Sequence, residues 1–241
     1  MRIDVVGTGD VYSDRLSPCM IIDKEIMFDM PNGSMKKLHQ MKIDVNKINK
    51  VLISHFHADH CMDIPFFLLE KNLNVQSNYG ETIFMGPKGL GEHIDNLLKV
   101  AYSTIDWNVI KENIKYKIIE LDDKLNDVIL DNYNIQSIPV EHSQSELCLG
   151  YLINDGQTTV AFTGDSRLCK NIEYLVKMSK VCFADMSSEE SLATHMGLKD
   201  IEYLNKENQC IVYPVHTSDK VLKKYREKGY KVINDGDSIL I

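Results

Sequence analysis

The sequence contains little that would mark a secreted or membrane-bound chain. Its cysteines include no CxxC pair, and no apolar run approaches the roughly 18 residues that a membrane-spanning helix needs. The chain opens on a strand-like segment, Arg2-Ile3-Asp4-Val5-Val6, and not on the charged and then apolar pattern of a signal peptide. We therefore expect a cytoplasmic protein without a membrane partner, whose thiols stay reduced and mostly buried. The cysteines are Cys19, Cys61, Cys148, Cys169, Cys182 and Cys210.

Positive charge is also scarce, and no linker divides the chain. Lys and Arg total 27 against 35 Asp and Glu, which gives a net charge of −8. An extended nucleic-acid surface needs clustered Lys and Arg, so this balance argues against one, whereas a small anionic substrate depends only on the local potential. No stretch rich in Pro, Gly or Ser interrupts the 241 residues, of which 44% are hydrophobic. We expect a single domain over residues 1–241.

Strands dominate the first two thirds of the sequence, and helices separate the strands near the end. The helices are predicted at 60–73, 90–100, 168–178, 197–205 and 218–228. The strands are predicted at 2–6, 19–23, 25–29, 50–54, 82–85, 115–121, 127–130, 133–140, 147–153, 158–163, 181–184, 210–214, 230–233 and 238–241. This order predicts an α/β fold with two sheets packed face to face and helices outside, a four-layer αββα sandwich.

The strongest functional signal is the segment SHFHADH at residues 54–60, directly after the apolar run KVLI. His55 and His57 are two residues apart, so their rings can converge on one ion if the loop is extended. Asp59 and His60 begin the next helix and point elsewhere, towards a second ion. Imidazole and carboxylate groups are ligands that divalent zinc, manganese and iron accept. The segment therefore predicts a site for two metal ions.

Four more polar side chains stand next to predicted elements. His142, Asp165 and His216 each follow an apolar strand, and His195 precedes the helix at 197–205. Taken singly, each fits an ordinary solvated, turn or capping residue. Together with SHFHADH they complete two metal sites. The two remaining histidines are interpreted as ordinary surface side chains; they are His39 and His93.

The order of these residues along essentially the whole chain resembles the metallo-β-lactamase superfamily. By that resemblance His55, His57 and His142 bind one divalent ion, Asp59, His60 and His216 bind a second, and Asp165 bridges both. The resemblance implies Zn²⁺, although Mn²⁺ or iron would accept the same nitrogen and oxygen ligands. Asp29 matches an acidic position of the superfamily and is expected to orient a ligand.

The ligand types narrow the reaction to hydrolysis. Asp instead of Cys at position 165 differs from the zinc β-lactamases, and His instead of Glu at position 57 differs from the di-iron oxygen reductases. Four segments resemble the tRNase Z group of phosphodiesterases: VVGTG at 5–9, GPKG at 86–89, TGDS at 163–166 and TH at 194–195.

Two features lead away from tRNA itself. In that group an arm that grips tRNA is inserted between the positions of His142 and Asp165, and here only 22 residues separate them. The chain also lacks a dense basic stripe. We therefore expect a phosphodiesterase for small nucleotide-derived substrates, such as cyclic nucleotides or ribose cyclic phosphates, which acts through a metal-bridging hydroxide. Asp59 would accept a proton from the attacking water, and His195 would stabilise the developing charge or protonate the leaving oxygen.

Other functions stay open on the sequence alone. A tRNA 3′-end processing endonuclease would use the same ligands. So would an acyl hydrolase of the thioesterase, lactonase or glyoxalase II type, although the separate helical domain of glyoxalase II is missing. A non-catalytic metal-binding module is disfavoured because the ligand set is intact. By analogy with the tRNase Z group, we also expect a homodimer.

Overall fold

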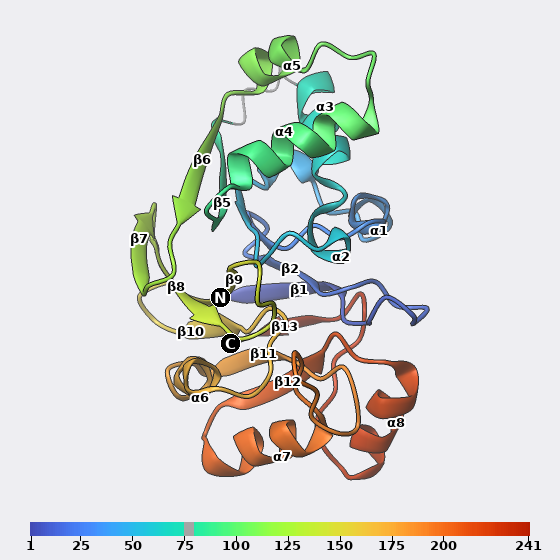
Figure 1. The fold of residues 1–241 in the computed structure, drawn as a ribbon, viewed down its shortest axis with the longest axis vertical. Coiled ribbons are helices and arrows are strands. Elements are labelled where there is room, and N and C mark those ends of the chain that lie inside the picture. The colour runs from blue at the N-terminus through green and yellow to red at the C-terminus, as the bar shows by residue number, and fades with distance from the viewer. Residues whose placement is uncertain (75–79) are drawn as a thin grey trace.

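The computed structural model describes residues 1–74 and 80–241 and shows two β-sheets between two groups of helices (Figure 1). The first sheet has the strand order β13-β1-β2-β3-β4-β5-β6, and the second has the order β12-β11-β10-β9-β8-β7. The strands are β1 (Arg2–Gly7), β2 (Cys19–Ile22), β3 (Ile26–Phe28), β4 (Lys50–Leu52), β5 (Thr82–Pro87), β6 (Tyr116–Leu121), β7 (Asn126–Leu130), β8 (Tyr133–Val140), β9 (Cys148–Asn154), β10 (Thr159–Phe162), β11 (Val181–Asp185), β12 (Ile211–Val215) and β13 (Ser238–Leu240).

The helices pack on the outer faces of the two sheets, the earlier group on the first sheet and the later group on the second. Their apolar residues recur every three or four positions, which gives each helix one buried face; in α4 these are Leu90, Ile94 and Leu98. The helices are α1 (Ser34–Gln40), α2 (Ala58–Cys61), α3 (Ile64–Leu73), α4 (Leu90–Ala101), α5 (Trp107–Ile114), α6 (Lys170–Lys177), α7 (Leu198–Glu207) and α8 (Asp219–Glu227), with a 3₁₀ turn, η1, at Val45–Lys47.

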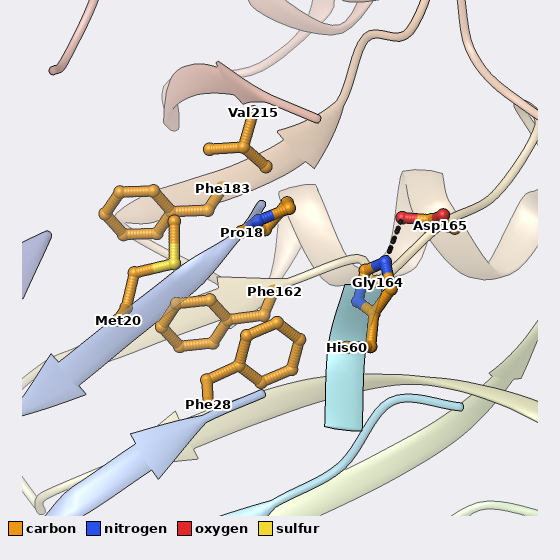
Figure 2. A pocket seen from close by; sticks show the side chains of 9 residues that line it. All are labelled: Pro18, Met20, Phe28, His60, Phe162, Gly164, Asp165, Phe183 and Val215. Carbon is orange, nitrogen blue, oxygen red and sulfur yellow. Dashed lines mark ion pairs between the residues drawn. The ribbon is translucent and has the colours of Figure 1, made fainter. Parts of the chain in front are cut away.

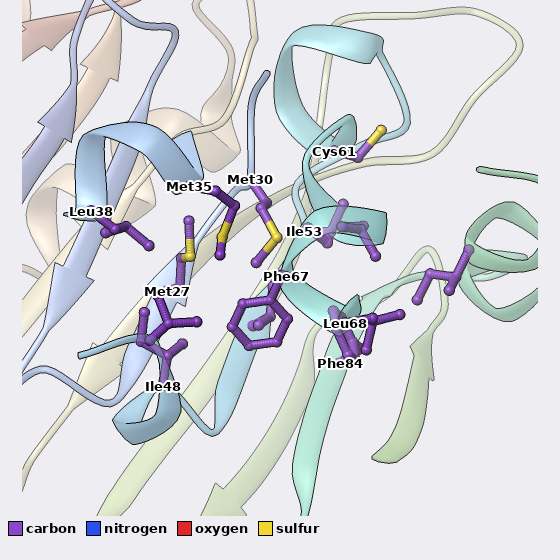
Figure 3. Close-up of a cluster of buried hydrophobic side chains, with 14 of the residues drawn as sticks. Met27, Met30, Met35, Leu38, Ile48, Ile53, Cys61, Phe67, Leu68 and Phe84 are labelled. Carbon is purple, nitrogen blue, oxygen red and sulfur yellow. The ribbon is translucent and has the colours of Figure 1, made fainter. Parts of the chain in front are cut away.

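Three hydrophobic clusters fill the spaces between the four layers. Successive side chains on a strand point to opposite faces, so neighbouring residues enter different clusters. On β2, Ile21 packs outward under the first helices and Met20 packs inward between the sheets. The outward cluster includes Met35 and Phe67 from α1 and α3 (Figure 3). The predicted αββα sandwich is therefore confirmed.

Strand direction decides where the loops gather. In the second sheet β8, β10, β11 and β12 run the same way, because β9 is antiparallel to both of its neighbours and β10, β11 and β12 are parallel. In the first sheet β3, β4 and β5 are parallel. The carboxyl ends of parallel strands lie along one edge of a sheet, which is where ligands usually bind in such sheets.

Several predicted elements differ from the structure. The helix expected at 60–73 is two helices, α2 and α3, because Pro65 in the first turn of α3 starts a new helix after Asp63. The strand expected at 230–233 has no strand pairing and is irregular. Helices α1 and α5 were not predicted. Among the described residues, no helix combines the length and apolar character required to cross a bilayer.

Candidate metal centre

The candidate ligands leave both sheets at the same rim. His55 and His57 lie on the loop that follows β4, and Asp59 and His60 belong to α2 directly after it. The second sheet contributes residues just past the carboxyl ends of its strands: His142 after β8, Asp165 after β10 and His216 after β12. The structure thus brings together all seven side chains that the sequence predicted as ligands.

The first group contains the three histidines expected around one ion. His55, His57, His142 and Asp165 each offer a ligand atom, and these atoms lie within 4.8 Å of one another. His142 donates its Nδ1 hydrogen to the backbone carbonyl of Thr194 at 3.0 Å, which leaves Nε2 facing His57 Nδ1 at 3.2 Å. A histidine whose second nitrogen is fixed in this way presents one defined lone pair to a metal.

The second group lies beside the first and shares Asp165 with it. Ligand atoms of Asp59, His60 and His216 also lie within 4.8 Å of one another. Asp165 Oδ1 is 3.4 Å from His60 Nε2, and its Oδ2 is 3.4 Å from His216 Nε2 and 3.9 Å from His55 Nε2. One carboxylate therefore faces both groups, the position expected of a bridging ligand.

The electrostatics of the two groups differ. Burial lowers the pKa values of His55 and His142, so these imidazoles stay neutral, which is the form that binds metal. Burial would also lower the pKa of His216, but the charge of Asp165 and the hydrogen bond that His216 donates to Asp59 outweigh it and raise that pKa to about 9. The carboxylates thus favour a protonated, positively charged imidazole in the second group. A divalent cation would supply the same positive charge.

Unsatisfied atoms support the fit of metal ions to these residues. Within the described part of the chain, His55 Nε2, His60 Nε2 and Asp165 Oδ1 are buried without a hydrogen-bond partner. Leaving a buried polar atom unpaired costs about 1–3 kcal/mol. All three atoms point into the two groups, so metal coordination would satisfy them together. The donor set of imidazoles and carboxylates also suits Zn²⁺, Mn²⁺ and iron.

A small cavity between the sheets borders the centre on its inner side (Figure 2). His60 and Asp165 line one end, and the rings of Phe28, Phe162 and Phe183 line the other. Phe28 and Phe162 stack with their centroids 4.5 Å apart, and Phe162 stacks on Phe183 at 5.2 Å. This apolar wall keeps water from the inner side of the centre, which strengthens the charge interactions there.

Asp29 supports the loop that follows β4. It is fully buried, and its Oδ2 accepts hydrogen bonds from His60 Nδ1 at 2.7 Å and from Ser54 Oγ at 2.8 Å. Its Oδ1 accepts from the backbone N–H of Ser54 at 2.8 Å. The Ser54 hydroxyl also lies 2.9 Å from His55 Nδ1. Asp29 therefore holds His60 directly and contacts His55 through Ser54.

His195 also reaches the centre, through contacts that the sequence did not reveal. Its ring lies 4.7 Å from the ring of His142 and 5.3 Å from that of His216. Its Nδ1 donates to Asp185 Oδ2 at 2.8 Å, and Ser187 Oγ is 3.0 Å away. Burial would lower the pKa of His195, but the Asp185 carboxylate outweighs it and raises that pKa. Sequence reasoning missed Asp185 and Ser187, although Asp185 directly follows the strand predicted at 181–184, just as His142, Asp165 and His216 follow theirs.

His93 is not the surface residue that the sequence suggested. Its ring stacks on Phe56, within the SHFHADH loop, with centroids 4.5 Å apart and planes 10° from parallel. Its Nε2 lies 3.2 Å from Cys61 Sγ, and burial lowers its pKa. His93, on α4, therefore braces the SHFHADH loop. His39, in contrast, is exposed and pairs with Glu70, as expected of a surface side chain.

A family model described as "Anti-Pycsar protein Apyc1" matches residues 1–237. The chain belongs to this family. Its sequence is also similar to ribonuclease Z of Methanococcus maripaludis strain C5, with 29% identity over 150 residues, and to ribonuclease Z of Streptococcus gordonii, with 27% over 165 residues. These matches cover 59% and 64% of this chain, but only 45% and 50% of the relatives. The chain thus spans about half the length of the curated relatives that it matches.

Solved structures share the whole fold at low sequence identity. The short form of human tRNase Z superposes with a TM-score of 0.78 at 16% identity, covering 100% of this chain and 99% of that one. A diphosphatase of the PhnP family gives 0.76 at 15% identity, covering 100% and 97%. This chain thus shares the metallo-β-lactamase fold with tRNase Z, the group that its sequence motifs resemble.

Proposed function

We propose that this chain is a metal-dependent hydrolase that holds two divalent ions, most suitably Zn²⁺, and cleaves small nucleotide phosphodiesters such as cyclic nucleotides or ribose cyclic phosphates. The observation that carries the proposal is the convergence of seven imidazoles and carboxylates into two adjacent groups that share Asp165. The first ion would be held by His55, His57 and His142, the second by Asp59, His60 and His216, with Asp165 between them.

The chain's own residues would divide the remaining work. Bound divalent ions supply Lewis acidity towards phosphate oxygens and make water more acidic. Asp59 is partly open to solvent between His60 and His216, so its carboxylate can accept a proton from the attacking water. His195 gives its Nδ1 hydrogen to Asp185, so its Nε2 is the nitrogen that can donate a proton to the leaving oxygen.

A small substrate suits the surroundings better than a long nucleic acid. The 22 residues between His142 and Asp165 fold mainly as β9 and β10 with a turn at Gly156, which leaves no room for an arm. Cations near the centre are paired: Arg15 with Asp219, and Arg167 with Glu141. Glu146 adds negative charge 3.9 Å from His57 Nε2. A polyanion would meet little uncompensated positive charge outside the metal ions.

Cleavage of tRNA is the second candidate, favoured by the ribonuclease Z relatives. An acyl hydrolase or a non-catalytic metal module would carry the same ligand set, and a panel of substrates distinguishes both from a phosphodiesterase. The resemblance to tRNase Z also leads us to propose a homodimer, and we keep the cytoplasm as the expected location. These points stay predictions.

A substrate panel tests the proposed function. We expect the metal-loaded protein to hydrolyse bis(p-nitrophenyl) phosphate and a cyclic nucleotide, and to leave a thioester, a lactone and precursor tRNA intact. His195→Gln should lower kcat by about 10²–10⁴-fold, the usual contribution of a general acid, and retain its metal. His39→Gln, at an exposed histidine, is the matched control and should behave like wild type. Turnover of the acyl compounds alone, or of precursor tRNA alone, would overturn the choice of substrate.

A further inference from the structure

The hydroxyl of Ser187 lies behind two histidines of the centre. Its Oγ is 2.7 Å from Asp185 Oδ1, 2.8 Å from His216 Nδ1 and 3.0 Å from His195 Nδ1. Ser187 follows β11 by two residues and is not among the candidate ligands. The contacts therefore join one hydroxyl to a carboxylate and to two imidazoles.

Counting hydrogens fixes the direction of these bonds. A serine hydroxyl has one hydrogen to donate, and a carboxylate can only accept. The Ser187 hydrogen therefore goes to Asp185 Oδ1, and its oxygen accepts the Nδ1 hydrogen of His216. In the neutral ring this assignment leaves the lone pair on His216 Nε2, the atom that lies 3.3 Å from Asp59 Oδ2 and 3.4 Å from Asp165 Oδ2. It is the tautomer that a metal ligand requires.

The other sheet carries the same arrangement. Ser54 Oγ donates to Asp29 Oδ2 at 2.8 Å and lies 2.9 Å from His55 Nδ1, which leaves the buried His55 Nε2 facing the centre. In each case a fully buried aspartate also holds a second histidine directly: Asp29 holds His60, and Asp185 holds His195. The same aspartate–serine–histidine chain thus occurs once on each side of the centre.

We propose that Ser187 and Ser54 are paired positioning residues, each of which fixes one histidine, His216 and His55 respectively, for a different ion of the proposed two-metal centre. The inference rests on the proposed metal site but not on the identity of the substrate. Each serine links a buried aspartate to a histidine that the aspartate does not itself hydrogen-bond; Asp185 Oδ1, for example, is 3.8 Å from His216 Nδ1. Loss of one hydroxyl should therefore lower the affinity for one ion and leave the affinity for the other unchanged.

Metal titration of the apoprotein tests this. Zn²⁺ is added to chelator-treated wild type, Ser187→Ala, Ser54→Ala and the double variant, and both stoichiometry and affinity are measured by calorimetry. We expect each alanine variant to lose about 10–100-fold in affinity for one of two ions, the usual effect of losing an outer hydrogen bond to a metal ligand. The double variant should have lower affinity for both ions. Ser187→Thr keeps a hydroxyl and should restore wild-type affinity.

The controls separate this inference from the proposed function. Ser188→Ala removes an adjacent exposed hydroxyl that bonds to the backbone of Glu190, and it should leave both affinities unchanged. If an alanine variant fails to fold, serine can instead be replaced by cysteine, which has nearly the same shape but forms only weak hydrogen bonds. The cysteine variant should show the same loss of affinity for one ion. The inference would be overturned, and the proposed function left standing, if both alanine variants bound Zn²⁺ with wild-type affinity. The same holds if the threonine variant bound Zn²⁺ as weakly as the alanine variant. Fewer than two ions in wild type would overturn the two-metal proposal itself.

Discussion

At the scale of single residues, the centre depends on backbone conformations that side chains rarely adopt. Asp29 and His216 both have φ of 52°, in the left-handed region that glycine occupies most easily. Such conformations persist where the surroundings hold them, and they concentrate at functional sites. Here the hydrogen bonds of Asp29 to Ser54 and His60, and of His216 to Ser187, hold them in place.

Replacing the buried carboxylate of Asp29 tests its supporting role. Asp29→Asn suits the left-handed backbone, since Asn tolerates it well, but it removes the charge that holds His60 Nδ1. We expect about 10–100-fold weaker metal binding in a folded protein, measured by calorimetry with Zn²⁺.

Asp131→Asn is the matched control for that experiment. Asp131 also has φ of 52° but is exposed and pairs with Lys50, away from the ligands. Metal affinities should stay unchanged in this variant. Equal affinity in Asp29→Asn and wild type would remove Asp29 from the metal centre.

The sequence revealed the residues of the centre unevenly, for a physical reason. The SHFHADH segment was recognisable because its ligands are close in the chain, and the other ligands because they complete a known order. Asp185 and Ser187 carry no such spacing, since their partners His195 and His216 are brought to them only by the loop before α7 and by the pairing of β12 with β11. His93 was misinterpreted because its partner Phe56 lies on a different element.

At the scale of secondary structure, long alternating strands were predictable and short elements were not. Strand β8 was predicted at its observed bounds, since its alternation continues over eight residues. Helix α1 has seven residues and is preceded by Gly33, whose φ of 88° no apolar pattern signals. The segment at 230–233 was mistaken for a strand because it is apolar. Its Ile233 packs between the sheets without pairing to any strand, so burial alone accounts for the apolar residue.

Helix α3 carries a buried lysine that should make stability depend on pH. The Nζ of Lys71 donates to the backbone carbonyl of Asn46 at 2.9 Å, and burial lowers its pKa from 10.5 to about 8. Between these two values the unfolded chain binds more protons at this position than the folded protein does. The contribution of Lys71 to the free energy of unfolding should therefore rise with pH from about 8 to about 10.5.

Urea unfolding of wild type and Lys71→Met across that pH range checks this expectation. The stability of wild type relative to the variant should increase with pH, because Met has no proton to lose. Lys99→Met, at an exposed lysine on α4, is the control and should run parallel to wild type. A constant difference between wild type and Lys71→Met would contradict the assignment.

At the scale of the whole molecule, the two sheets share a core and both contribute residues to the candidate metal centre. The cluster between them includes Phe28 from β3 and Phe162 from β10, and the proposed ligands also come from both sides. Separation of the sheets would expose the core and break up the ligand set together. We therefore keep the prediction that residues 1–241 form one cooperative domain.

Calorimetric unfolding tests that prediction. The calorimetric and van't Hoff enthalpies of the apoprotein should agree, as for a two-state transition. Zn²⁺ should raise the melting temperature in proportion to the logarithm of its concentration once the centre is saturated. A homodimer whose folding depends on association would in addition melt at a higher temperature as chain concentration rises. Two separate transitions in the apoprotein would contradict a single domain.

The wide spacing of the ligands along the chain has a consequence for biosynthesis. The ribosome delivers residues in order, so the segment at 55–60 emerges long before His142, Asp165 and, last of all, His216. His216 follows β12, which lies at one edge of the second sheet. A nascent chain that ends before β12 therefore cannot assemble the full ligand set. Metal loading and activity would thus wait until β12 and His216 have left the exit tunnel.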